Sequence, residues 1–336
     1  MKLPSGGEVH RCFYPFKLDA YGCGCSNDCL YCYAKSCLEF RSLWNPESPS
    51  VADVDKLEKI FSDALSNNKG KFKELIRERL PVRLGGMTDC FGDIEEFERS
   101  TYAIIKMLNH FNYPYLILTK NKLVAEYARF MKKHLAYIQF SITTPYDSVS
   151  KKFEGNASST SERLEALKKV SEAGFYTAVR INPLFPMYPD GYFSQKKKFP
   201  TGARKFRYFD WSLVDRSIDA GANTIIAGFL RLSSWNIKWI KDKTGQDLTW
   251  LFDTSTKQKN QALHFSTEEK RYYYENIREV CWIKGADFSV CYDGDDDYEK
   301  FRYLWANQDD CCNGKGNIEG FAKTYDFFNK DFIKQG

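Results

Sequence analysis

The stretch from Tyr21 to Ala34 reads YGCGCSNDCLYCYA and places Cys25, Cys29 and Cys32 in the spacing C-x3-C-x2-C. Three thiolates on one compact loop can bind three irons of a 4Fe–4S cluster, because cysteine is the usual ligand of such clusters. The fourth iron then stays open for another ligand. Such a site has to exclude water, since a reactive intermediate would otherwise be lost to side reactions.

Two other interpretations of this cysteine group compete with the cluster. Cys23 together with the three cysteines above can form a zinc-binding interaction module, although structural zinc usually takes paired CxxC units or histidines. The CLYC segment at 29–32 alone also matches a redox CxxC motif. The chain has eleven cysteines. Because disulfides are rare in a reducing cytosol, clustered cysteines indicate metal binding or catalysis.

The composition is that of a soluble globular chain, with 336 residues, 43% hydrophobic and 28% charged. No apolar run reaches the roughly 18 residues of a membrane span, so we expect no membrane association. The first residues lack the apolar stretch of a signal peptide, and we therefore expect a cytoplasmic protein. A net charge of +5 permits a nucleic-acid partner without arguing for one.

Outward from the cysteine stretch, apolar strand-like runs alternate with helical patterns, which predicts βαβ units and a parallel sheet. We expect an α/β fold, an open partial TIM barrel of (β/α)6 type, with the active site at the carboxyl ends of its strands. The barrel is expected to span residues 1–295, and residues 296–336 to form a C-terminal extension that covers its lower side or mouth. The expected strands are 80–84, 115–118, 137–142, 177–181, 223–229 and 286–292, and the expected helices 94–111, 121–134, 159–174 and 266–285.

Four segments carry a resemblance to a known family: YGCGCSNDCLYCYA, LGGMTDCFGDIE, LILTKN, and FSITT followed by SERLEALKKVSEAGF. Over about residues 20–186 the chain resembles the radical S-adenosylmethionine (SAM) superfamily, in its spore photoproduct lyase and DNA repair photolyase-like branch. The resemblance implies a lyase- or transferase-type enzyme whose open iron binds SAM. The reduced cluster then cleaves SAM to methionine and a 5′-deoxyadenosyl radical, with electrons from a donor such as flavodoxin or ferredoxin.

The resemblance also implies roles for residues at the predicted strand ends. Asp89, Lys120 and Ser141 would contact polar groups of SAM, and Gly85 and Gly86 resemble the edge that receives its amino group. A lysine beyond an apolar strand can bind a carboxylate by a charge-assisted hydrogen bond. The structural alternatives are a surface lysine, a satisfied core serine, a helix-capping aspartate and a glycine turn.

Three further candidates follow from the same resemblance. Tyr31 and Tyr33 match two tyrosines that flank the last cluster cysteine, one packing near the adenine and one in a radical relay. Arg180 is a candidate for the SAM carboxylate, with an ordinary salt bridge as the alternative.

One position departs from the pattern of the lyase. A cysteine that gives a hydrogen atom to the product radical falls on Met87 here, and a thioether has no S–H to donate. Cys90 lies three residues further on. It is either a hydrogen donor or substrate-side ligand, or a small buried hydrophobe.

The segment 192–211, YFSQKKKFPTGARKFRYFDW, predicts contact with nucleic acid, because basic side chains can meet phosphates while aromatic rings stack on bases. A solvated basic loop with its rings in the core is the alternative. We expect a thymine-like base in DNA as substrate, either a lesion or a modified base. The basic residues are Lys196, Lys197, Lys198, Arg204, Lys205 and Arg207, and the candidate stacking rings Phe199, Phe206 and Tyr208.

Four cysteines near the end of the chain, Cys281, Cys291, Cys311 and Cys312, can hold a second cluster, although adjacent cysteines are awkward ligands for one cluster. In that case the enzyme would modify a peptide or a small molecule.

Overall fold

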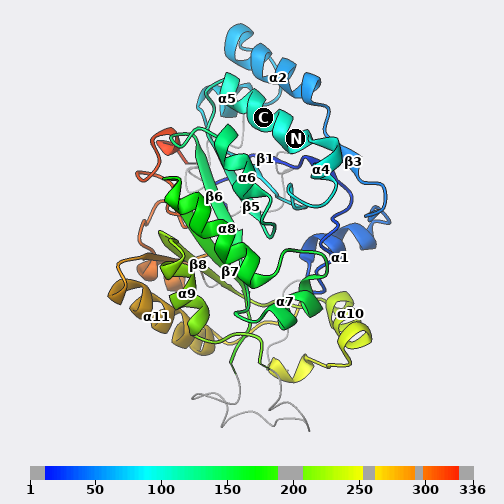
Figure 1. Ribbon diagram of the computed structural model, residues 1–336, viewed down its shortest axis with the longest axis vertical. Helices are drawn as coiled ribbons and strands as arrows, with labels where there is room; N and C mark the ends of the chain where they lie inside the picture. The colour runs from blue at the N-terminus through cyan, green and yellow to red at the C-terminus, as the bar shows by residue number, and fades with distance from the viewer. Residues whose placement is uncertain (1–11, 188–206, 253–261, 292–297, 325–336) are drawn as a thin grey trace.

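The computed structural model describes residues 12–187, 207–252, 262–291 and 298–324. Its centre is a sheet of seven parallel strands whose order in space follows their order in the chain (Figure 1). Because each strand pairs with the next one of this sheet, the sheet forms the open barrel expected from the sequence. The strands are β1 (Lys17–Leu18), β4 (Val82–Leu84), β5 (Tyr115–Thr119), β6 (Ala136–Ser141), β7 (Thr177–Leu184), β8 (Thr224–Phe229) and β9 (Asp287–Val290).

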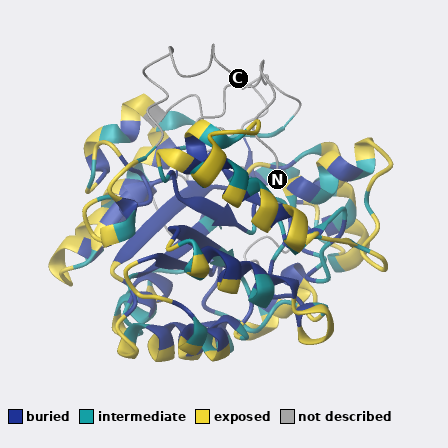
Figure 2. Ribbon diagram, turned by 90° about the horizontal axis from the view of Figure 1, so that it is seen from above, coloured by how far each residue is buried: buried dark blue, intermediate teal, exposed yellow. Residues whose placement is uncertain are grey.

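The inner strands are apolar because both of their faces are covered. Every residue of β6 and of β8 is buried. The helices lie outside the sheet and show exposed residues on their outer sides, whereas the strands are buried throughout the centre (Figure 2). The helices are α1 (Tyr33–Phe40), α2 (Val54–Asn67), α3 (Lys73–Arg77), α4 (Glu95–Glu98), α5 (Ser100–His110), α6 (Val124–Tyr127), α7 (Asp147–Glu154), α8 (Thr160–Glu172), α9 (Ser212–Asp219), α10 (Ser234–Thr244), α11 (Thr267–Ile283) and α12 (Tyr298–Phe301).

Two predicted helix starts are confirmed by their caps. Ser159 and Glu162 form the capping box that opens α8. Ser266 accepts a hydrogen bond from the Glu269 backbone at the start of α11. Beyond α8, Gly174 takes the left-handed conformation with φ of 85°, which glycine adopts without steric cost.

Two predicted helices are broken. The pattern at 94–111 forms α4 and α5, because Arg99 between them has a φ of 51°. The Glu95 carboxylate there accepts hydrogen bonds from the backbone of Thr101 and Tyr102 at 2.8 and 2.9 Å, which fixes the turn. The expected helix at 121–134 shortens to α6 and the 3-10 turn Ala128–Phe130.

Short strands were missing from the sequence prediction. β1 has two residues, as do β2 (Tyr21–Gly22) and β3 (Ser50–Val51), which pair antiparallel in a separate small sheet. Two residues carry no periodicity that a sequence pattern can reveal.

The segment 298–324 packs at the amino-terminal end of the sheet, beneath the strand ends that carry the site. The Gly320 N–H donates to the carbonyl of His134, just before β6, at 2.8 Å. The Phe321 ring meets Tyr137 edge-on at a centroid distance of 5.9 Å. The expected domain boundary between residues 295 and 296 lies outside the described residues. Among the described helices, none has the length and apolar character that crossing a membrane requires.

Candidate active site

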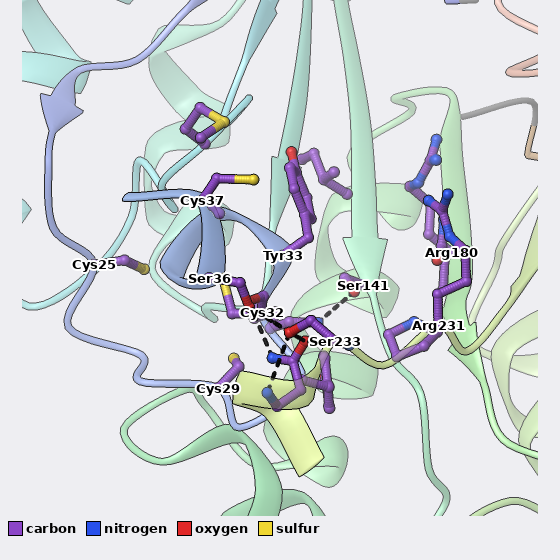
Figure 3. A pocket seen from close by; sticks show the side chains of 18 of the residues that line it. Cys25, Cys29, Cys32, Tyr33, Ser36, Cys37, Ser141, Arg180, Arg231 and Ser233 are labelled. Carbon is purple, nitrogen blue, oxygen red and sulfur yellow. Dashed lines mark hydrogen bonds between the residues drawn. The ribbon is translucent and has the colours of Figure 1, made fainter. Parts of the chain in front are cut away.

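A cavity of about 840 Å³ opens at the carboxyl ends of the strands (Figure 3). The cysteine loop between β2 and α1 forms one side of it, and residues at the carboxyl ends of β4, β5 and β6 contribute to its lining. Of the twelve site residues predicted from the sequence, the cavity brings together all but Cys90. They are Cys25, Cys29, Tyr31, Cys32, Tyr33, Gly85, Gly86, Asp89, Lys120, Ser141 and Arg180.

The cysteine loop is held by backbone contacts with the end of α7. The Leu30 N–H donates to the carbonyl of Phe153 at 2.8 Å, and the Asn156 N–H donates to the carbonyl of Asn27 at 3.2 Å. Gly155 lies so close to this loop that a Cβ on it would be 2.4 Å from the Asn27 oxygen. The Cys32 sulfur accepts a hydrogen bond from the Lys35 N–H at 3.3 Å and caps α1.

Burial disfavours the thiolate form of all three loop cysteines. It raises the pKa of Cys25 to about 12, with the negative charge of Asp89 adding to the effect. Burial likewise raises the pKa values of Cys29 and Cys32, although the positive charge of Lys120 partly opposes it. Thiolates therefore require a cationic group bound between them, and iron bound by these sulfurs supplies that charge.

The three cysteines suit a multi-iron cluster better than a single ion. Among the described residues, no three or more His, Cys, Asp or Glu side chains are close enough together to hold one metal ion. A cubic cluster spreads its cysteine ligands over separate irons, so its ligands lie further apart than those of zinc. Three thiols on one loop that faces an open cavity therefore fit a 4Fe–4S cluster with one iron left for another ligand.

Lys120 stands at the centre of the polar lining. Its ammonium donates to the Ser141 hydroxyl at 2.5 Å and lies 3.2 Å from the Glu154 carboxylate. It also lies 5.5 Å from the centre of the Tyr31 ring. β5 and β6 are adjacent parallel strands, which is why residues at their carboxyl ends meet. Lys120 is therefore part of a buried polar network and not a surface lysine.

Glu154 is the residue of this network that the sequence did not reveal. Its side chain is 1% exposed and pairs with the fully buried Arg163 as well as with Lys120. It also accepts hydrogen bonds from the hydroxyls of Tyr31 and Ser150. Burial alone would raise the Glu154 pKa, but the charges of Arg163 and Lys120 outweigh it and lower that pKa. No motif marks a glutamate at the end of a helix as the partner of residues on three other elements.

Asp89 connects the cysteine loop with the end of β5. Its carboxylate accepts from the Thr119 hydroxyl at 2.7 Å, the Lys120 N–H at 2.6 Å and the Asn27 amide at 3.0 Å. A further bond comes from the Phe91 N–H at 3.0 Å. Through these four hydrogen bonds, Asp89 holds the cysteine loop against the end of β5 at the cavity wall. Asp89 is therefore not the helix cap that was considered as its alternative.

The two predicted tyrosines differ in exposure. Tyr31 is 8% exposed, and burial followed by the charge of Glu154 raises its pKa. Tyr33 is 52% exposed, and its hydroxyl donates to the carbonyl of Gly86 at 2.5 Å. Tyr208, a candidate for stacking on bases, is only 1% exposed and stacks on Phe185 at 3.6 Å. It is a core residue, and that expectation was wrong.

Cys90 lies apart from the cavity. It is fully buried, it is not among the lining residues, and burial raises its pKa. Its environment is that of the small buried hydrophobe considered as the alternative. Met87 does line the cavity, where its backbone N–H donates to Asp19 at 2.9 Å.

The side of the cavity opposite the cysteine loop is basic. Arg180 and Arg231 lie across from Cys25 and Cys29 in Figure 3. His264 and Lys270 line the cavity as well. The basic segment 192–211 lies outside the described residues except for its last five positions.

Comparison with known proteins identifies the fold and the family. The sequence model of the radical SAM superfamily matches residues 21–195, more than half of the chain. The spore photoproduct lyase of Bacillus subtilis (strain 168) is 23% identical over 169 residues, which cover 49% of this chain and 44% of the lyase. The match thus spans less than half of the length of that relative.

Solved structures of spore photoproduct lyase share the fold. A mutant with bound AdoMet and dinucleoside spore photoproduct superimposes with a TM-score of 0.59 at 16% identity, covering 86% of each chain. Another mutant gives a TM-score of 0.58 at 17% identity, covering 86% of this chain and 79% of the other.

Proposed function

This chain belongs to the radical SAM superfamily, and we propose that it abstracts a hydrogen atom from a nucleobase in DNA. Membership makes it an enzyme that uses a 4Fe–4S cluster and SAM. When bound, the reduced cluster supplies the 5′-deoxyadenosyl radical by cleaving SAM. The substrate that we propose is thymine-like, either a lesion or a modified base.

The observation that carries the proposal is the single cavity shared by the cysteine loop and the polar strand ends. Cys25, Cys29 and Cys32 would hold the cluster, because they are the thiols that line this cavity together on one loop. Lys120 and Ser141 would bind the SAM carboxylate, since their polar atoms already lie 2.5 Å apart at the cavity wall.

Further residues would position SAM. Gly85 has a φ of 81° and lies where a Cβ would be 2.4 Å from the Leu118 oxygen, so the backbone edge of Gly85 and Gly86 is held tightly. Tyr33 fixes this edge through its bond to the Gly86 carbonyl. Asp89 would act through Asn27 and Lys120, and Tyr31 would pack at the cluster side of the bound cofactor.

The basic side of the cavity supports an anionic substrate. Arg231 and Lys270 line the cavity, and Arg231 lies opposite the cysteines in Figure 3, so the phosphates of a nucleic acid can be bound there. The relatives with the same fold provide the second support, because one of them is solved with a dinucleoside photoproduct. Flavodoxin or ferredoxin is the electron donor that we propose.

The proposal is tested by anaerobic release of 5′-deoxyadenosine from the reconstituted, reduced protein, with and without thymine-rich DNA. We expect DNA to stimulate release by about tenfold or more, because a bound substrate holds the reacting groups in place. Slow release that DNA leaves unchanged would contradict the DNA proposal and favour a peptide or small-molecule substrate. No release from iron-loaded protein would contradict the proposed reaction.

A further inference from the structure

Two arginines inside the barrel contact cysteines that are remote from the cysteine loop in sequence. Arg180 of β7 donates from one nitrogen to the Cys291 sulfur at 2.7 Å and from another to the Cys312 sulfur at 3.5 Å. Arg83 of β4 reaches the Cys12 sulfur at 3.9 Å. Both arginines also line the cavity, so this second group of sulfurs lies against the cavity wall.

Cys311 completes the group. It forms a side-chain hydrogen bond with Cys312, and the charges of Cys291 and Cys12 act on it as well. The four thiols, Cys12, Cys291, Cys311 and Cys312, all interact electrostatically with Arg180. Their attraction raises the pKa of this arginine although burial acts in the opposite direction.

The turn that carries the adjacent cysteines is fixed by a buried carboxylate. Asp310 accepts hydrogen bonds from the backbone N–H groups of Cys312, Gly314 and Lys315 at 2.9, 2.7 and 2.9 Å. The Tyr137 hydroxyl donates to the Cys312 carbonyl at 2.5 Å. A buried carboxylate therefore holds this turn by hydrogen bonds, as the Asp89 carboxylate does for the cysteine loop.

One buried polar group beside these sulfurs has no partner. The Ser289 hydroxyl of β9 is buried without a hydrogen bond in the part of the chain that the structure describes. Gln139 accepts from Arg180 at 3.2 Å through its oxygen, which places it beside the sulfurs. Ser289 and Cys291 are two residues apart along one strand direction and so face the same side. A buried donor without an acceptor is costly unless a ligand supplies one.

We propose that Cys12, Cys291, Cys311 and Cys312 bind an iron–sulfur cluster of their own inside the barrel. Four thiolates give the group the ligands that such a cluster needs. The two guanidinium groups offset its negative charge, and the unpaired Ser289 hydroxyl finds an acceptor in its inorganic sulfide. Cys281, the fourth ligand expected from the sequence, lies on α11 with Asp287 and Asp215 as its charged neighbours, and Cys12 takes its place.

Four cysteine thiolates are the usual ligand set of an iron–sulfur cluster. Structural zinc also binds four cysteines, so the metal content of the reconstituted protein distinguishes the two.

The test separates the two groups by mutation. In a Cys25→Ala/Cys29→Ala/Cys32→Ala variant, reconstituted anaerobically with iron and sulfide, we expect about two to four irons per chain and an equal amount of sulfide. Iron–sulfur absorption and electron paramagnetic resonance of the reduced protein are the readouts. Adding Cys291→Ala and Cys312→Ala to this variant should remove the iron, whereas adding Cys281→Ala, a matched buried cysteine, should leave it unchanged.

If the variants with further substitutions do not fold, the iron content of the Cys25→Ala/Cys29→Ala/Cys32→Ala variant alone still decides the test. A folded loop variant, verified by circular dichroism and gel filtration, that binds no iron would overturn the proposal. Stoichiometric zinc without iron, or a disulfide among the four cysteines that persists after reconstitution, would also overturn it. These readouts do not depend on DNA or on SAM cleavage, so the failure of this proposal and that of the proposed function are distinguishable.

Discussion

The two cysteine groups of this barrel differ in how the fold assembles them. The loop cysteines lie within eight residues of chain, line the cavity and are held by backbone contacts to α7. The second group draws its members from both ends of the chain and gathers them around Arg180. The first group leaves the cavity in front of it open for ligands. The second is enclosed by charged and polar side chains, which is typical of a structural or electron-transfer site.

The largest effect is expected from removing one loop ligand. Cys29→Ala should lower 5′-deoxyadenosine release by at least about a thousandfold, because the cluster is the source of the radical. Cys281→Ala, which changes a cysteine on α11 that does not line the cavity, should leave release within about twofold of the unchanged protein. Release by Cys29→Ala at more than a tenth of the normal rate would show that the loop does not carry the active cluster.

The Glu154 network supports the loop, and its loss should cost stability. Glu154→Gln leaves the buried Arg163 without its counter-charge, so we expect a loss of about 3–5 kcal/mol in the free energy of unfolding by urea. Glu162→Gln, which removes an exposed partner of Lys122, should cost at most about 1 kcal/mol. Equal losses in the two variants would contradict the structural importance of the network.

The pH dependence of this contribution has a definite sign. The Glu154 pKa is lowered in the folded protein, so its contribution to stability is complete above its ordinary value of 4.5. This contribution to stability is lost as the pH falls below 4.5 and the Glu154 carboxylate becomes protonated. The difference in stability between Glu154→Gln and the unchanged protein should therefore be constant between about pH 6 and about pH 8 and shrink in acid. A difference that grew on acidification would have the wrong sign.

Gly155 tests the contact between the loop and α7. Gly155→Ala would put a Cβ against the Asn27 carbonyl, and we expect the variant to lose at least about half of the loop cluster's iron to a chelator under conditions that the unchanged protein survives. Gly70 also has a positive φ, of 100°, but open space around its Cβ, so Gly70→Ala controls for the strain of a positive φ without a contact. Iron loss to the same extent in both variants would mean that the contact with Asn27 is irrelevant.

Cluster retention should also depend on pH. Burial raises the pKa of all three loop thiols, and the pKa of Cys25 reaches about 12. The thiols are therefore protonated before the cluster binds, and cluster binding has to release these protons. We therefore expect iron in a variant that lacks Cys291 and Cys312 to be lost more readily to a chelator at about pH 6 than at about pH 8. Retention that is independent of pH would argue that the thiols do not bind as thiolates.

The sequence revealed those parts of the site that local spacing or strand position encodes. The three loop cysteines follow a short motif, and Lys120 and Ser141 lie at the ends of apolar strands. Glu154 and Asn27 stayed hidden, because their partners are brought to them by packing between distant elements. The same reason explains the second cysteine group. Cys291 and Cys312 were candidates as cysteines of the tail, but only the fold shows that Cys12 joins them in place of Cys281.

The most direct test of the proposed reaction follows the hydrogen atom that is transferred from the base to 5′-deoxyadenosine. The reduced enzyme is incubated with SAM and a DNA substrate whose thymines are fully deuterated, and the 5′-deoxyadenosine is analysed by mass spectrometry. The account predicts that 5′-deoxyadenosine gains deuterium, since the radical takes its hydrogen from the base. Release of 5′-deoxyadenosine without deuterium, at a rate unaffected by the DNA, would contradict it.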